Sequence, residues 1–311
     1  TKFLTLRQVL FERKWNQRLL ATVTVVSLFT SINAQAQKTP SDVFMQTQRA
    51  ISEVELIRAN KGVSNDAKTV GVQKKKRPLH VFGKCVEVIE KVVRLQKMEH
   101  VTPSVIPSIP LRKVTPAEVY GCTETVITGL HSVKNKLGVA DTISEPATAT
   151  KKKPSHVYRN MWQLSYLLDT LVGQISPNEV FKNVKSMQNE LALIADTQSI
   201  SLNTSATGVS NKTPKDVLLN CFSGLTVLKK VQRKMKVKPL KVPRVPSGEI
   251  LPSDVYDCTN MQLTELHVIK VNLGIKEKRS RVETPTGQTP SDVFAQMDLY
   301  DNQIKQLLGK L

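Results

Sequence analysis

The hexapeptide TPSDVF occurs twice in the chain, at Thr39–Phe44 and at Thr289–Phe294. Six looser copies bring the total to eight. In each copy a proline is followed by any residue, then by Asp, Glu or His, then by Val, and then by an aromatic residue or Leu. Their prolines are Pro40, Pro78, Pro116, Pro154, Pro177, Pro214, Pro252 and Pro290. Successive prolines are 37 or 38 residues apart except at the centre, where the step is 23. A fixed period of this length indicates an internal repeat, and we infer eight units in two tandem halves.

Each copy of the pattern predicts the first turn of a helix. Proline is favoured at the first helical position, because its missing amide proton would have no partner there. Thr39 is the expected N-cap, and Asp42 stands where a carboxylate can accept the N-cap amide, as in a capping box. The other carboxylates at this position could instead form a ring of cation ligands, but capping is the preferred interpretation for Glu118, Glu179, Asp216, Asp254 and Asp292.

Apolar residues continue from each start with helical spacing. Counted from the proline as zero, position 3 is Val in all eight units, and position 14 is always aliphatic. Positions 7, 10 and 17 complete a series, 3, 7, 10, 14 and 17, whose steps alternate between four and three. This is the spacing of the apolar face of a helix that packs against other helices. We therefore predict an all-α fold of two tandem four-helix bundles, built from eight single-helix repeats of about 38 residues and divided into residues 37–176 and 177–311.

The connectors and cysteines indicate parallel helices within each half. About 15 residues separate most helices, which is enough extended chain to return along the preceding helix, whereas antiparallel neighbours need only about 2–8. In parallel neighbours, cysteines at matching heights come within the ~7 Å Cα separation that a disulfide requires. We predict Cys85–Cys122 and Cys221–Cys258. Pairing between the halves and free buried thiols are the alternatives.

Two connectors are rich in proline at matching positions, residues 101–114 and 237–250. Proline at this density favours polyproline II, which makes a semi-rigid strap. A peptide-docking motif is the alternative. Because span and repetition both account for the prolines, we interpret these segments as straps that cross from the end of one helix to the start of the next.

Residues 1–36 have the organisation of a secretory signal peptide. Basic residues precede an apolar run at Leu19–Phe29, and the small-x-small sequence Ala34–Ala36 is a cleavage site. The run is shorter than the ~20 residues of a transmembrane helix, which disfavours a membrane anchor, and no other run is long enough to span a membrane. We expect cleavage after Ala36 and a periplasmic or secreted protein, a compartment in which disulfides persist.

The chain is strongly basic, with a formal net charge of +19. Residues 1–36 hold five basic residues and one acidic residue, so the mature chain keeps +15. Such a protein is drawn to anionic surfaces, anionic polymers or acidic partners. Low aromatic content, 5%, and export both argue against nucleic acid as the partner.

Two helix starts lack the carboxylate and follow a run of basic residues. His80 follows Lys74–Arg77, and His156 follows Lys151–Lys153. Helix N-termini attract anions, so this end of the first half is a candidate anion-binding face. Its residues are Lys74, Lys75, Lys76, Arg77, His80, Lys151, Lys152, Lys153 and His156. The alternative is a pair of solvated linkers whose lysines serve solubility.

No motif for catalysis or for a cofactor occurs in the sequence. CxxCH, CxxC, HExxH, GxSxG and the Walker loop are all absent. The equivalent histidines His131 and His267 share no partner four residues on, which argues against a metal site. We therefore expect no enzyme, no cofactor and no metal. The leading hypothesis is an exported binding or scaffold protein for an anionic envelope component or protein partner, and the alternative is a periplasmic small-molecule sensor or carrier with its ligand in the bundle.

Overall fold

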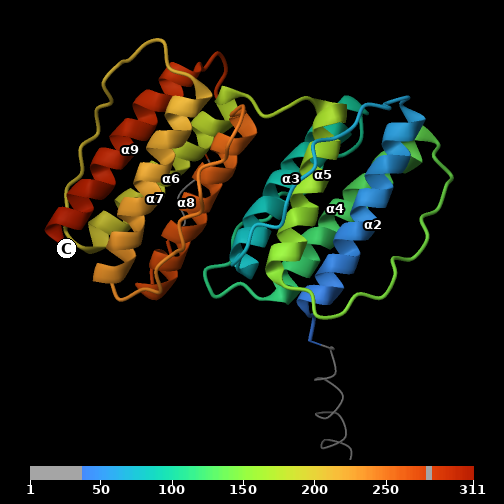
Figure 1. Ribbon diagram of the computed structural model, residues 1–311, viewed down its shortest axis with the longest axis horizontal. Coiled ribbons are helices and arrows are strands. Elements are labelled where there is room, and N and C mark those ends of the chain that lie inside the picture. Colours follow the sequence, from blue (N-terminus) through green and yellow to red (C-terminus); the bar gives the residue numbers. More distant parts are fainter. Residues whose placement is uncertain (1–36, 278–281) are drawn as a thin grey trace, which may run out of the picture. The chain divides into compact units, whose positions relative to one another are not determined.

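The computed structural model describes residues 37–277 and 282–311. The predicted signal peptide lies outside these residues. Within them the protein is all-helical, with eight helices and no strand (Figure 1). The helices are α2 (Pro40–Asn60), α3 (Pro78–Met98), α4 (Pro116–Leu137), α5 (Pro154–Val172), α6 (Pro177–Thr197), α7 (Pro214–Lys234), α8 (Pro252–Asn272) and α9 (Pro290–Lys310). None of these helices is long and apolar enough to cross a membrane.

Every helix begins at the proline of the repeated pattern, and the local hydrogen bonds explain why. In α2 the Thr39 amide donates to Asp42 Oδ2 at 2.7 Å, and the Asp42 amide donates back to Thr39 Oγ1 at 3.3 Å. In six helices, α2 included, the carboxylate two residues after the first proline accepts the N-cap amide in this way. The six carboxylates therefore cap their helices, as predicted.

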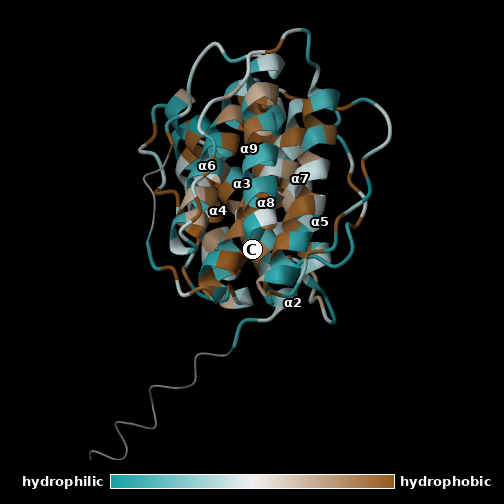
Figure 2. Ribbon diagram, turned by 90° about the vertical axis from the view of Figure 1, so that its left-hand side faces the viewer, coloured by the Kyte–Doolittle hydropathy of each residue, from teal (hydrophilic) through white to brown (hydrophobic). Residues whose placement is uncertain are grey.

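The helices pack in two groups, each around its own apolar core. In the first group α2 and α3 each contact α4 and α5, and in the second α6 and α7 each contact α8 and α9. Each helix carries both hydrophobic and hydrophilic residues along its length (Figure 2). The valine at position 3 of every repeat is no more than 2% exposed, and the aliphatic residue at position 14 is fully buried.

The helix starts of each group meet around one small cavity. The first proline and first valine of α2, α3, α4 and α5 line a space of about 10 Å³. The same residues of α6, α7, α8 and α9 line a space of about 20 Å³. Each space has room for about one water molecule at most, so the valine layers leave little room for a ligand.

The four cysteines lie in two pairs at disulfide distance. Cys85 on α3 and Cys122 on α4 have their Cα atoms 6.4 Å apart, and Cys221 on α7 and Cys258 on α8 have theirs 6.3 Å apart. All four side chains are buried. These are the two pairs that the sequence predicts.

A buried glutamine near the end of α3 and of α7 fixes the proline-rich connector that follows. Gln96 Oε1 accepts the Ser104 amide at 2.7 Å, and Gln232 Oε1 accepts the Leu240 amide at 2.7 Å. Both glutamines are at most 2% exposed, so each connector is anchored to the helix that precedes it.

The two groups touch where α3 packs against α8. Gly83 permits the close approach, because a Cβ atom at that residue would lie only 2.9 Å from Thr264 Cγ2. Ion pairs also join α3 to α6 near this point. Lys182 binds Glu90 at 3.0 Å, and Arg94 binds Glu179 at 3.2 Å.

Candidate functional site

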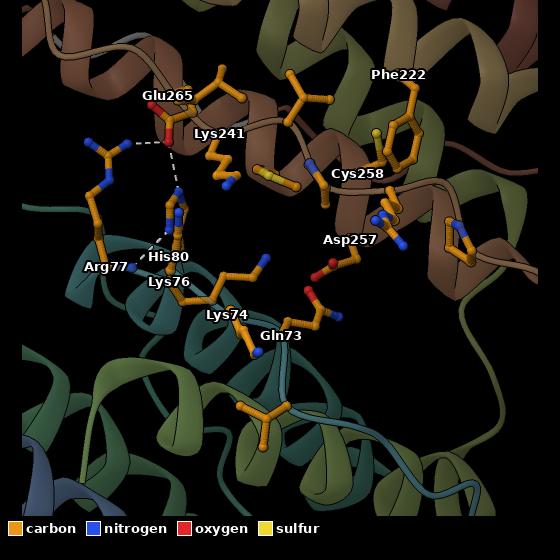
Figure 3. A pocket seen from close by; sticks show the side chains of 18 of the residues that line it. Gln73, Lys74, Lys76, Arg77, His80, Phe222, Lys241, Asp257, Cys258 and Glu265 are labelled. Carbon is orange, nitrogen blue, oxygen red and sulfur yellow. Dashed lines mark hydrogen bonds and ion pairs between the residues drawn. The ribbon is translucent and has the colours of Figure 1, made fainter. Parts of the chain in front are cut away.

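A cavity of about 850 Å³, the junction cavity, opens where the two helix groups meet (Figure 3). Residues 72–77 and the first turn of α3 form one wall. Residues 238–246 of the second proline-rich connector form the opposite wall, and α8 contributes side chains between Asp254 and Glu265. The cavity thus combines the first basic run with a segment more than 150 residues further along the chain.

The lining of the junction cavity is strongly basic. Seven lysine and arginine side chains line it against three carboxylates, which leaves a formal excess of four positive charges. Four of the seven come from the predicted site, residues 74–77. The other three are Lys238, Lys241 and Arg244.

All three lining carboxylates already have partners. Glu265, which is fully buried, accepts hydrogen bonds from the Arg77 guanidinium, from His80 Nε2 at 2.7 Å and from Gln232 Nε2 at 2.7 Å. Asp257 accepts the Tyr158 hydroxyl, and Asp254 accepts the Leu251 amide at 2.9 Å. Asp254 and Asp257 keep their negative charges, because their donors are neutral, and the lining retains its formal excess of four positive charges.

The pKa of Glu265 is held well below its ordinary value. Burial acts to raise it, but hydrogen bonds from His80 and Arg77 and the positive charge of Arg77 outweigh burial and bring the pKa to about 2. A carboxylate with strong donors on both oxygens favours the charged form in this way. Glu265 is therefore ionised at neutral pH and ties α8 to the start of α3.

His80 caps α3 as a neutral residue. Its Nδ1 accepts the Arg77 amide at 3.1 Å, so its Nε2 carries the proton that it donates to Glu265. Burial lowers the pKa of His80, which keeps the ring uncharged. His156 caps α5 similarly, since its Nδ1 accepts the Lys153 amide at 3.0 Å. The histidines thus replace the capping carboxylates in function, without their negative charge.

One lysine of each basic run has a packing role. The Lys76 amide donates to Ser155 Oγ at 3.1 Å, and its Nζ lies 4.1 Å from the centre of the Tyr158 ring. Burial lowers the pKa of Lys76. Lys152 repeats this arrangement on α2, with its amide 3.1 Å from Ser41 Oγ and its Nζ 4.4 Å from the centre of the Phe44 ring. Cation–π contact accounts for both ammonium positions.

The structure places the two predicted runs differently. Residues 74–77 and His80 line the junction cavity, whereas Lys151, Lys152, Lys153 and His156 do not. The second run lies instead at the start of α5, beside the start of α2. The nine predicted residues therefore do not surround one cavity.

Sequence reasoning missed the opposite wall, although the sequence held a signal for it. Lys238, Lys241 and Arg244 stand where the equivalent connector of the first half has Thr102, Val105 and Ser108. The prolines of the two connectors match, whereas these three positions are charged only in the second connector. Lys75 lines the cavity with this wall, and its positive charge lowers the pKa of Lys241.

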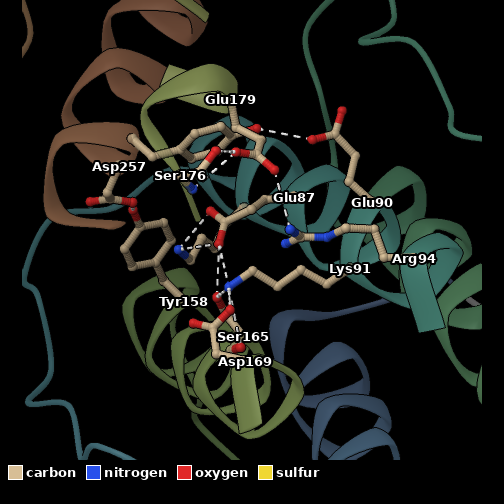
Figure 4. A network of polar contacts seen from close by, with 12 residues as sticks. Glu87, Glu90, Lys91, Arg94, Tyr158, Ser165, Asp169, Ser176, Glu179 and Asp257 are labelled. Carbon is tan, nitrogen blue, oxygen red and sulfur yellow. Dashed lines mark hydrogen bonds and ion pairs between the residues drawn. The ribbon is translucent and has the colours of Figure 1, made fainter. Parts of the chain in front are cut away.

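A buried charged cluster lies between α3 and α5 (Figure 4). Lys84 Nζ contacts Glu87 Oε1 at 2.9 Å, Lys91 Nζ contacts Asp169 Oδ1 at 2.5 Å, and Ser165 donates to Glu87 Oε1 at 2.7 Å. Burial acts to raise the pKa of Glu87, but Lys84 and Lys91 outweigh it and lower that pKa. Burial lowers the pKa of Lys91 and raises that of Asp169. The charges compensate one another, so the cluster is structural.

The two equivalent histidines contact different groups. His131 Nε2 lies 2.7 Å from Glu53 Oε1, and His267 Nε2 donates to the Pro110 carbonyl at 2.8 Å. Across residues 37–277 and 282–311, no group of three or more His, Cys, Asp and Glu side chains is placed to hold a metal ion.

Comparison with known proteins provides no relative from which a role could be transferred. No protein-family model, curated protein or solved structure matches the chain. The function is therefore argued from the chain's own geometry and charge.

Proposed function

We propose that this chain is an exported, non-enzymatic helical-repeat protein that binds an anionic envelope component or an acidic protein partner. The junction cavity carries the proposal. Its lining has four more positive charges than negative ones, and its three carboxylates are hydrogen-bonded to other groups. A concave surface of one charge sign concentrates ligands of the opposite sign.

The proposal includes the architecture expected from the repeat. We infer parallel helices within each half, since the first residues of the four helices in each group line one cavity. Separate apolar cores support a division into 37–176 and 177–311. Cysteine pairs at disulfide distance are compatible with an extracellular protein and thus with removal of residues 1–36.

A periplasmic sensor or carrier of a small molecule is the second candidate. A ligand within a bundle would have little room, since the cavities at the helix starts measure about 10 and 20 Å³. The volume of the junction cavity, about 850 Å³, lies in the range of small-molecule sites. This volume favours a carrier whose ligand lies between the helix groups.

Binding of the chain from residue 37 to vesicles containing anionic lipid, and to an acidic polysaccharide, tests the proposal. Binding should weaken with added salt, because screening shortens the reach of exposed charges. It should also weaken when exposed lysines of the two predicted runs become glutamine. That variant changes Lys74, Lys75, Lys151 and Lys153, and leaves Lys76 and Lys152 on their aromatic rings.

A matched control removes the same charge elsewhere. It changes four exposed lysines to glutamine: Lys136, Lys215, Lys230 and Lys310. The site variant should lose at least several-fold more affinity than the control. Equal losses would show that only net charge matters, and binding that ignores salt would contradict the proposal.

A further inference from the structure

The junction cavity has a second basic wall that the sequence did not assign to any site. We propose that the cavity binds a compact oxyanion with two or more negative charges, such as a phosphorylated small molecule or head group, between Lys75 on one wall and Lys241 and Arg244 on the other. This inference rests on the proposed function, and it names the ligand class and the residues.

The distribution of charge between the two connectors favours a ligand over mere solubility. Both connectors share their prolines, and both are anchored to the preceding helix by a buried glutamine. Only the connector that lines the cavity has Lys238, Lys241 and Arg244. Both connectors have a net charge of +2, so they differ in where the charge lies, and the second connector places its basic residues on the cavity wall.

Two like charges approach each other across the cavity. Lys75 and Lys241 come from opposite walls, and the effect of Lys75 lowers the pKa of Lys241. Two ammonium groups at short range repel, and an oxyanion between them converts that repulsion into two attractions.

Among the ion pairs between described residues, none involves Lys75, Lys241 or Arg244. Of the nearby carboxylates, Glu265 pairs with Arg77 and His80, and Asp257 accepts the Tyr158 hydroxyl and acts on Lys76. Lysine supplies point charges and arginine a planar fork of donors, which together suit phosphate or carboxylate oxygens.

The backbones of both walls are anchored, which reduces the cost of ordering the site on binding. On one wall the buried Gln232 accepts the Leu240 amide at 2.7 Å and donates to Glu265 at 2.7 Å. On the other wall the Lys76 amide donates to Ser155 at 3.1 Å, one residue from Lys75. The charged side chains are exposed while their backbones are fixed. A cavity of about 850 Å³ exceeds what a single phosphate fills, so we infer a ligand with several charged groups.

Isothermal titration calorimetry with inorganic tripolyphosphate at low salt tests this inference on the chain from residue 37. We expect one saturable site per chain. The variant K238T/K241V/R244S copies the connector of the first half and should bind at least ~10-fold more weakly, which is ~1.4 kcal/mol. Its prolines are unchanged, and its melting temperature without ligand checks that it folds. Lys75→Gln on the opposite wall should also weaken binding. This single substitution tests the site even if the triple variant does not fold.

The matched control K136Q/K215Q/K230Q removes the same charge from exposed helix surfaces and should keep its affinity within about threefold, because distant charges are screened. Equal loss in the control and the triple variant, or binding of several ions per chain, would overturn the site. If tripolyphosphate binding depends only on Lys151 and Lys153, the site is wrong while the proposed function stands. If neither tripolyphosphate nor anionic vesicles bind, both fail.

Competition identifies the natural source of the oxyanion. Vesicles of phosphatidylglycerol that displace tripolyphosphate would support a lipid head group as the ligand. Binding of tripolyphosphate that such vesicles leave unchanged would support a free phosphorylated molecule. Both outcomes support an oxyanion site in the junction cavity.

Discussion

The substitution Glu265→Gln tests how the start of α3 is tied to α8. Glu265 has no exposed surface, and it accepts hydrogen bonds from Arg77, His80 and Gln232. Glutamine has nearly the same shape but cannot carry the negative charge. The substitution therefore reproduces the protonated state of Glu265 and leaves the Arg77 guanidinium without its counter-ion.

The magnitude follows from the pKa of Glu265. That pKa falls from 4.5 to about 2 in the folded protein. At ~1.36 kcal/mol for each pKa unit, the ionised carboxylate stabilises the fold by ~3 kcal/mol at neutral pH. Because the folded-state pKa is lowered, this stability is present above about pH 4.5 and is lost as the pH falls toward 2.

Urea unfolding followed by far-UV circular dichroism measures both effects. At pH 7 the Glu265→Gln variant should lose ~3 kcal/mol of unfolding free energy, and the difference from the parent should shrink as the pH falls below about 4.5. Glu124→Gln on the exposed face of α4 is the control and should change stability by less than ~0.5 kcal/mol. A difference that stays constant between pH 7 and pH 3 would refute the linkage, and an unchanged midpoint at pH 7 would refute the ion pair.

Other substitutions address packing and backbone conformation. Lys91→Met leaves two buried carboxylates without their shared cation and should cost ~3–5 kcal/mol in urea unfolding. Gly83→Ala should cost ~1–3 kcal/mol, since its Cβ would lie 2.9 Å from Thr264 Cγ2. Adding Thr264→Ser, which removes that methyl group, should restore part of the loss, and strict additivity would contradict the clash. Ser199→Gly should raise stability by up to ~1 kcal/mol in thermal unfolding, because Ser199 has a φ of 54° after the end of α6. No gain would show that this serine is not strained.

The local and periodic features were determined by the sequence alone. A Thr, Pro and Asp at Thr39–Asp42 specify a helix start through hydrogen bonds within four residues, so no distant contact is needed. The valine at position 3 and the aliphatic residue at position 14 are buried in every repeat, because a seam of fixed period presents them to one side of the helix. The cysteine pairs followed from matching heights on neighbouring helices.

The candidate site depended on contacts that no local pattern records. Glu265 occupies an ordinary helix position, and it becomes a buried anion only because Arg77, 188 residues earlier in the chain, meets it across the α3–α8 contact. From the sequence, Lys76 is one more lysine of a solvated basic run. In the structure its ammonium group packs over the Tyr158 ring, and burial lowers its pKa. Lys241 enters the cavity because Gln232 anchors its connector. Residues close in sequence are enough to specify a helix start. Burial, charge pairing and the junction cavity depend instead on which helices come into contact, and only the tertiary structure decides which helices do.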